Sequence, residues 1–166
     1  QVGDIKYYEE PDEEHMRHLK SLPKSILTEQ SLKEMMSESL FKLNLANLTW
    51  IKNEHMNKLG FLAPNIMDLN ISATCASDST LEELGRTLLK LEAIDISNCS
   101  NLTEKGVTAF FENCPPLKKF WAAYCSDSVT DQSLQHFTQS NELISFNIDF
   151  CKNVTEESLK VIIEAA

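Results

Sequence analysis

Apolar residues return at fixed places along most of this chain. From residue 91 onward, three segments share the order apolar-x-x-apolar-x-apolar-x-x-Cys and end at Cys99, Cys125 and Cys151, which stand 26 residues apart (125 − 99 and 151 − 125). Alternation of apolar and polar residues over a few positions predicts a strand with one buried face. A fixed period of this length indicates that one supersecondary unit is stacked on copies of itself.

Two earlier segments follow the same order with Leu48 and Thr74 in place of the final cysteine. The strand segments are therefore 40–48, 66–74, 91–99, 117–125 and 143–151. Strand alternation predicts that their inner apolar positions are nearly fully buried: Leu43, Leu45, Leu69, Ile71, Ile94, Ile96, Phe120, Phe146 and Ile148. It also predicts that the position between each pair is exposed: Asn44, Asn70, Asp95, Trp121 and Asn147.

The second half of each unit has the pattern of a helix start. Thr103, Thr130 and Thr155 each precede acidic residues and an apolar i, i+3 pair. A hydroxyl cap followed by carboxylates in the first turn is typical of a helix N-terminus. The expected core pairs of the helices are Met56/Leu59, Leu81/Leu84, Val107/Phe110, Leu134/Phe137 and Leu159/Ile162.

Together with the motif at 114–117, Cys-Pro-Pro-Leu, these patterns resemble the cysteine-containing leucine-rich repeat of F-box/leucine-rich-repeat proteins and related axonemal proteins. The resemblance covers roughly residues 40–166 and is most specific in the last three units. It implies an α/β fold: a leucine-rich-repeat solenoid, or horseshoe, with parallel strands on the concave face and helices on the convex face. Such proteins mostly bind other proteins along one long face.

The chain divides into three parts in this interpretation. Residues 1–14 form an acidic N-terminal extension, and residues 15–39 form an irregular half-repeat or cap. Residues 40–166 hold five repeats of about 26 residues, and the last one is expected to be uncapped. An uncapped end exposes the edge of the core, so we expect further repeats or a partner there.

Composition excludes some classes of partner. The formal net charge is −10 and the isoelectric point is near 4.8, which disfavours nucleic acid because its binding requires Lys and Arg on the phosphates. A basic protein partner is favoured instead. The sequence has no apolar run of about 18 residues, so no membrane span is expected.

The residues that carry chemistry predict no enzyme, cofactor or metal site. The three cysteines of the repeat are interpreted as core residues, a structural ladder suited to the reducing cytoplasm. His15 and His18 have the spacing of two metal ligands, but no third ligand is near them in sequence. Only four glycines occur, and neither a phosphate loop nor a nucleophile motif is present. Asn-x-Ser/Thr sequons could indicate glycosylation, but the repeat itself places Asn at the turn and Thr at the cap.

Aromatic residues at strand positions that the fold does not require are the candidate site. Trp121, Tyr124 and Phe150 should cluster on the concave face, because adjacent strands stack roughly 4.8 Å apart. Exposed aromatics are typical interface anchors. Alternatively, they cover a missing repeat or an irregular turn. Further partner-binding candidates at the polar rim are Lys119, Asp95 and Asp149.

Three functions are consistent with this pattern. The first is a non-enzymatic protein-interaction module that holds a partner on the concave face. The second, implied by the resemblance, is the substrate-recognition part of an F-box type ubiquitin ligase subunit. The third is a structural subunit of a large assembly such as a ciliary axonemal complex, which would place the protein in the cytoskeleton or cilium.

Overall fold

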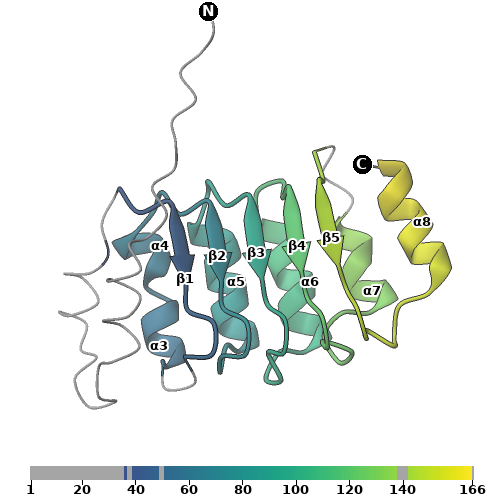
Figure 1. The fold of residues 1–166 in the computed structure, drawn as a ribbon, viewed down its shortest axis with the longest axis horizontal. Coiled ribbons are helices and arrows are strands. Elements are labelled where there is room, and N and C mark those ends of the chain that lie inside the picture. Colours follow the sequence, from purple (N-terminus) through teal and green to yellow (C-terminus); the bar gives the residue numbers. More distant parts are fainter. Residues whose placement is uncertain (1–35, 37–38, 49–50, 138–141, 166) are drawn as a thin grey trace, which may run out of the picture.

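The computed structural model describes residues 36, 39–48, 51–137 and 142–165. Strands and helical segments alternate along these residues (Figure 1). Their order is β1 (Lys42–Asn44), α3 (Asn53–Met56), α4 (Leu59–Leu62), β2 (Asp68–Asn70), α5 (Asp78–Thr87), β3 (Ala93–Asp95), α6 (Glu104–Asn113), β4 (Lys119–Trp121), α7 (Asp131–Leu134), the 3-10 helix η1 (Gln135–Phe137), β5 (Ser145–Asn147) and α8 (Glu156–Ala165).

The strands form one parallel sheet in the order β1-β2-β3-β4-β5. The central residues of neighbouring strands are opposite one another, as the repeat register predicts: Leu43, Leu69, Ile94, Phe120 and Phe146. Each connection between parallel strands carries helical segments, which is the geometry that a parallel pair requires. The predicted register is therefore confirmed.

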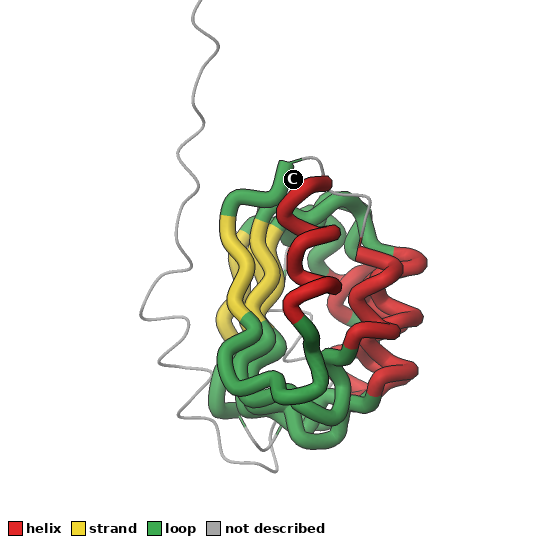
Figure 2. Tube along the Cα trace, turned by 90° about the vertical axis from the view of Figure 1, so that its right-hand side faces the viewer, coloured by secondary structure: helices red, strands yellow, loops and turns green. Residues whose placement is uncertain are grey.

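The helical segments cover one face of the sheet, and the core lies between the two layers (Figure 2). Seven of the nine strand residues predicted to be buried are at most 4% exposed, which confirms the prediction for the first four strands. The helical core pairs are buried as well, except Leu159 in α8, which is half-buried. Two of the pairs do not lie in single helices, because Met56 and Leu59 belong to α3 and α4, and Leu134 and Phe137 to α7 and η1.

The burial prediction is wrong at Phe146 and Ile148, which are only half-buried. Both belong to the unit of β5, the edge strand, so no strand of the described chain packs on their outer side. The last helix also departs from the simple repeat. Figure 2 shows α8 in front of the space between the strand and helix layers, so it lies over this end of the core instead of continuing the helix layer. Ile162 of α8 is 4% exposed, whereas Ile163 is 73% exposed.

The exposure prediction is also only partly correct. Of the five residues expected to be exposed at the strand ends, only Asn44 is exposed, and Asn70, Asp95, Trp121 and Asn147 are half-buried. The expected acidic extension, residues 1–14, and nearly all of the expected half-repeat, including His15 and His18, lie outside the described residues.

Candidate functional site

A turn with left-handed backbone follows every strand. The residue just before the ladder position has a positive φ in all five units: Asn47 (61°), Ala73 (52°), Asn98 (58°), Tyr124 (60°) and Phe150 (62°). Asparagine adopts this conformation readily, but for a bulky side chain it is an outlier. Units one to three place Asn or Ala at this position, whereas units four and five place large aromatics there.

The last residue of the strand helps to form the same turn in four of the units. The side chain of Asn44, Asn70, Asp95 or Asn147 accepts the backbone N–H two residues further on, at 2.8–2.9 Å. Asn and Asp commonly form such turns, so this role was readable from the sequence but was missed. Asn44 forms the same bond and is exposed, so the bond fixes the turn but does not by itself set the burial of these side chains.

Unit four lacks this side-chain acceptor because Trp121 occupies the position. The hydroxyl of Ser97, in the preceding unit, accepts the N–H of Ala123 at 3.0 Å instead. The turn is thus preserved by a neighbour, and the indole is released from the role that Asn or Asp has elsewhere.

Tyr124 and Phe150 stack on each other. Their ring centroids are 4.4 Å apart and the rings are nearly parallel, at 8°. Even in the stack the two residues stay 58% and 62% exposed. The pair is therefore a flat apolar surface at the ends of β4 and β5 that contributes little to the core.

Trp121 lies apart from this pair. Its Nε1–H donates to Oγ of Ser145 at 3.1 Å, and Nζ of Lys119 lies 5.8 Å from the centroid of its ring. That distance is within the range of a cation–π contact. Among the described residues no ring contact joins Trp121 to Tyr124 or Phe150, so the structure stacks two of the three expected aromatics and places the third on the adjoining part of β4.

The expected polar rim is distributed along the strand face. Asp95 is half-buried, forms its own turn and accepts Nδ2–H of Asn70 at 3.3 Å, so it has a structural role. Asp149 is exposed beside Phe150, and its backbone carbonyl accepts the N–H of Tyr124 at 2.8 Å. Lys119 lies over the indole of Trp121.

The cysteine ladder lies behind this face. Each thiol donates to a backbone carbonyl of the preceding unit: Cys99 to Ile71 at 3.2 Å, Cys125 to Ile96 at 3.3 Å and Cys151 to Ala122 at 3.0 Å. Burial raises the pKa of all three thiols. Thr74 takes the equivalent place in unit two and donates to Ile71 of its own unit at 2.7 Å. The three thiol contacts join neighbouring units, which is the kind of contact that a structural ladder makes.

The helix starts form a second ladder. The first-turn carboxylate of one helix accepts from the threonine cap of the next: Asp78 from Thr103 and Asp131 from Thr155, with backbone N–H to carboxylate distances of 2.7 and 2.8 Å. The backbone N–H of Thr155 is the main reason that the pKa of Asp131 is lowered. These carboxylates were expected to stabilise helix dipoles, and the structure adds a direct bond between units.

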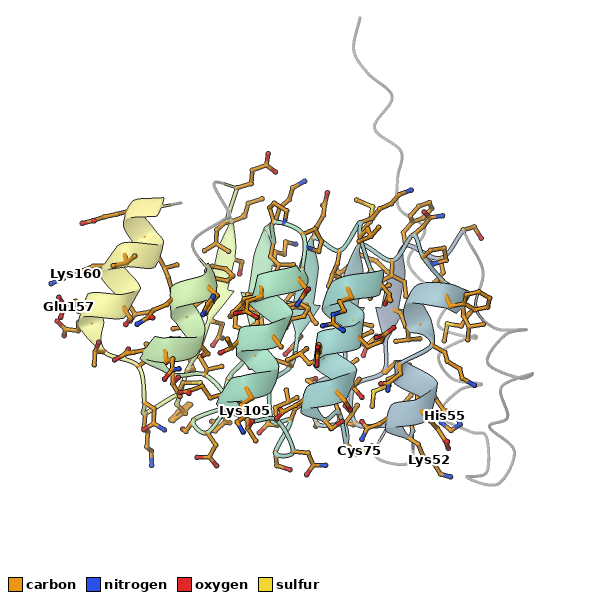
Figure 3. All side chains as sticks on the ribbon, turned by 180° about the vertical axis from the view of Figure 1, so that it is seen from behind. Lys52, His55, Cys75, Lys105, Glu157 and Lys160 are labelled. Carbon is orange, nitrogen blue, oxygen red and sulfur yellow. The ribbon has the colours of Figure 1, made fainter. Side chains whose placement is uncertain are left out.

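Figure 3 shows the molecule from behind, with several polar side chains labelled. Lys52 and His55 project from the β1 end of the molecule, and Glu157 and Lys160 project from α8 at the opposite end. No group of three or more potential metal ligands occurs among the described residues. Within the same residues, no helix is long and apolar enough to cross a membrane.

Solved structures identify the class of fold. The chain is similar to the tropomodulin C-terminal domain of Caenorhabditis elegans, with a TM-score of 0.62 and 22% identity over 83% of this chain and 91% of that one. It is also similar to leiomodin-1 actin-binding site 2, with a TM-score of 0.58 and 13% identity over 82% and 83% of the two chains. A third match is to the yeast Rad7–Elc1 complex, with a TM-score of 0.56, 15% identity, 90% of this chain and 34% of that one.

Together with the repeat, these likenesses define a leucine-rich-repeat-like α/β fold with a five-stranded parallel sheet. At this level of identity they concern the fold alone. No family model matches the chain.

Proposed function

We propose that this protein is a non-enzymatic protein-interaction module, a leucine-rich-repeat solenoid that binds a partner on its strand face. The anchors of the interface are Tyr124, Phe150 and Trp121, and Lys119 and Asp149 lie at its rim. One observation carries the proposal: the stacked and exposed pair of Tyr124 and Phe150 occupies left-handed positions where other units have Asn or Ala.

The energies favour a functional origin for this pair. A left-handed conformation costs about 1–2 kcal/mol for a residue with a Cβ atom, and less for asparagine. The ring stack returns about 0.5–1.5 kcal/mol. Two such residues therefore leave the fold with a net cost, and strain of this kind commonly persists where it serves binding. Large rigid aromatics are also the side chains that contribute most to protein interfaces.

A reducing compartment and a cytoskeletal setting belong to the same proposal. All five cysteines are free, which supports the cytoplasm over an oxidising environment. The non-enzymatic part of the proposal rests on the sequence, in which no nucleophile motif or phosphate loop occurs.

Actin binding is a second candidate function. The observation that favours it is the fold likeness to leiomodin-1 actin-binding site 2, which extends over more than four-fifths of both chains. Co-sedimentation of the purified chain with filamentous actin, and gel filtration with monomeric actin, test it. Co-migration that Tyr124→Asn/Phe150→Asn abolishes would identify actin as the partner, whereas no co-migration with either form would exclude it.

Two narrower roles remain as proposals: substrate recognition within an F-box ubiquitin ligase, and a structural role in a ciliary axonemal complex. Sequencing the gene that encodes this chain distinguishes them. An F-box would favour the first, and coiled coil or axonemal domains would favour the second.

The interaction proposal is tested with one pair of variants. Tyr124→Asn/Phe150→Asn removes the stack and substitutes the residue that units one and three use at this position. The control is Phe61→Ala, which removes an aromatic that is 83% exposed on α4. A partner is captured with the wild-type chain from its native source and purified, and its affinity for each variant is measured by calorimetry.

We expect at least thirtyfold weaker binding by the double variant, the equivalent of about 2 kcal/mol for a central anchor, and unchanged binding by the control. Trp121→Ala should weaken binding as well, with circular dichroism as the check on folding. Equal affinities of the double variant and the wild type would place the interface elsewhere.

A further inference from the structure

Within the described residues, main-chain groups at the outer edge of β5 have no hydrogen-bond partner, whereas the equivalent groups of every earlier unit are paired. In the four interfaces between units, an N–H just after the strand donates to the next unit: Leu45, Ile71, Ile96 and Ala122, at 2.7–2.9 Å. A second N–H, at the left-handed residue, does the same from Asn47, Ala73, Asn98 and Tyr124, at 2.8–3.0 Å. The equivalents in the last unit are Ile148 and Phe150, and neither N–H has an acceptor in the described part of the chain.

One acceptor completes this edge. The carbonyl of the residue that precedes the strand accepts two N–H groups from the next unit in each case: Phe41, Met67, Glu92 and Lys118. Its equivalent in the last unit is Ile144, which is 74% exposed. Figure 2 looks onto this end and shows α8 in front of the space between the layers, with the strand layer beside it. An exposed edge of this kind is a template for an extended chain.

The aromatic stack ends at the same edge. The left-handed residues of successive units are neighbours, so the ring of Tyr124 covers one face of the ring of Phe150. The other face of Phe150 points toward the position of a following unit, and Phe150 remains 62% exposed. A planar group on a chain that pairs with β5 would continue this stack.

The negative charge around β5 indicates which planar group the partner would carry. Residues 142–165 carry five carboxylates and two lysines, and the whole chain has a net charge of −10. Asp149 lies beside Phe150, and Glu156 stands where earlier helices have a carboxylate bonded to the next unit. Both carboxylates are exposed. Among planar side chains, the guanidinium of arginine is the one that both stacks on an aromatic face and pairs with carboxylates.

We propose that the β5 edge binds an extended, basic segment of a partner protein, parallel to β5, with an arginine stacked on Phe150 and paired with Asp149. The carbonyls of the bound segment accept the N–H groups of Ile148 and Phe150, and the N–H groups of the segment donate to the carbonyl of Ile144. This inference names a second binding location, the β5 edge, and the chemistry of the partner segment. It rests on the proposed function only because both use Phe150.

A labelled ten-residue peptide of alternating arginine and valine is the probe, and fluorescence anisotropy gives its affinity. The matched probes are the same peptide with lysine for arginine and the arginine peptide with every second amide N-methylated. The variants are Phe150→Asn and Asp149→Asn, with Phe61→Asn as the control on an exposed aromatic of α4.

We expect saturable binding of the arginine peptide, at least tenfold weaker with Phe150→Asn or with the N-methylated peptide, about fivefold weaker with lysine or Asp149→Asn, and unchanged with Phe61→Asn. Amide hydrogen exchange at Ile148 and Phe150 should slow at least tenfold at saturation. Absence of saturable binding, equal affinities for Phe150→Asn and Phe61→Asn, or unchanged exchange at both amides would overturn the inference.

The two proposals fail separately. If the peptide does not bind while the double variant still loses its native partner, the strand-face function stands and the edge inference is wrong. If the peptide binds as expected while the native partner binds the double variant as tightly as the wild type, the edge inference stands for basic extended chains and the strand-face function is wrong.

Discussion

The units of β1–β3 and those of β4–β5 share one backbone pattern but differ in nearly every side chain that the pattern leaves open. In the first region the strand ends carry Asn or Asp, which form the turns, and the left-handed positions carry Asn or Ala. In the second region Trp121, Tyr124 and Phe150 occupy three of the four equivalent positions. The first region shows what the fold requires, so the difference shows what the second has added.

The core differs in the same direction. The central strand residues of β1–β3 are Leu43, Leu69 and Ile94, whereas those of β4 and β5 are Phe120 and Phe146. These two rings pack with Phe111 and Phe137 at centroid distances of 4.9–5.9 Å. Edge-to-face and tilted ring contacts of this kind stabilise a core beyond the area that they bury. The aromatic surface and this aromatic core therefore belong to the same two units.

The largest effect on stability should come from these core phenylalanines. Phe120→Ala should lower the free energy of unfolding by about 3–5 kcal/mol, because a fully buried ring leaves a cavity. Phe146→Ala should cost less, since Phe146 is already half-buried at the sheet edge. Urea denaturation of both variants measures the difference, and equal losses would show that β5 is not an edge in solution.

The cysteine ladder should give the next effect. Cys125→Ser should lower the free energy of unfolding by on the order of 1–3 kcal/mol, because a more polar group enters a packed column. In the native state Cys125 should also react slowly with iodoacetamide, since burial raises the pKa of its thiol. An unchanged melting temperature, or alkylation as fast as in the unfolded chain, would remove the ladder from the core.

Alkaline pH should lower the free energy of unfolding through another cysteine, Cys114. Burial raises the pKa of the Cys114 thiol from 9.0 to about 12. A raised pKa means that the folded state retains a proton that the unfolded state releases, so stability is fully present below pH 9 and falls as the pH rises toward 12. Cys114→Ala should flatten this decline in urea denaturation between pH 8 and 11. A decline of the same slope in the variant would assign it to other groups.

A smaller effect is expected at the polar strand ends of the first three units. Asp95→Ala should lower the free energy of unfolding by about 1 kcal/mol, because the N–H of Ser97 and the amide of Asn70 lose an acceptor. Asp95→Asn should retain most of that stability because its side-chain oxygen can still accept the turn N–H. If the two variants were equally unstable, the charge of Asp95 would matter more than the turn.

The sequence predicted the features that recur. The register of the strands and the burial of residues such as Leu69 and Ile94 follow from the period alone, because one slip would turn every side chain to the wrong face. A cluster of Trp121, Tyr124 and Phe150 was also expected from the spacing of adjacent units, and the structure stacks Tyr124 on Phe150. The exposure of Asp95 was overestimated, because the alternation gives the side on which a residue lies but not how far the strands on either side of it cover that residue.

The end of the sheet was less predictable. The position of α8 depends on how the chain leaves β5, and nothing in the repeat distinguishes that path from the earlier ones. The separation of Trp121 from the aromatic pair depends on the bond to Ser145 and on the side-chain conformation of the indole, which sequence spacing does not specify.

The central claim is that Tyr124 and Phe150 are kept for binding and not for folding. Urea denaturation of Tyr124→Asn/Phe150→Asn tests it most directly, because Asn is the residue that the first region uses at the same backbone conformation. We predict a free energy of unfolding that is unchanged or higher by up to about 2 kcal/mol, as the relief of two left-handed aromatics outweighs the lost stack. A fall of more than about 1 kcal/mol would mean that the pair belongs to the fold and would contradict the account.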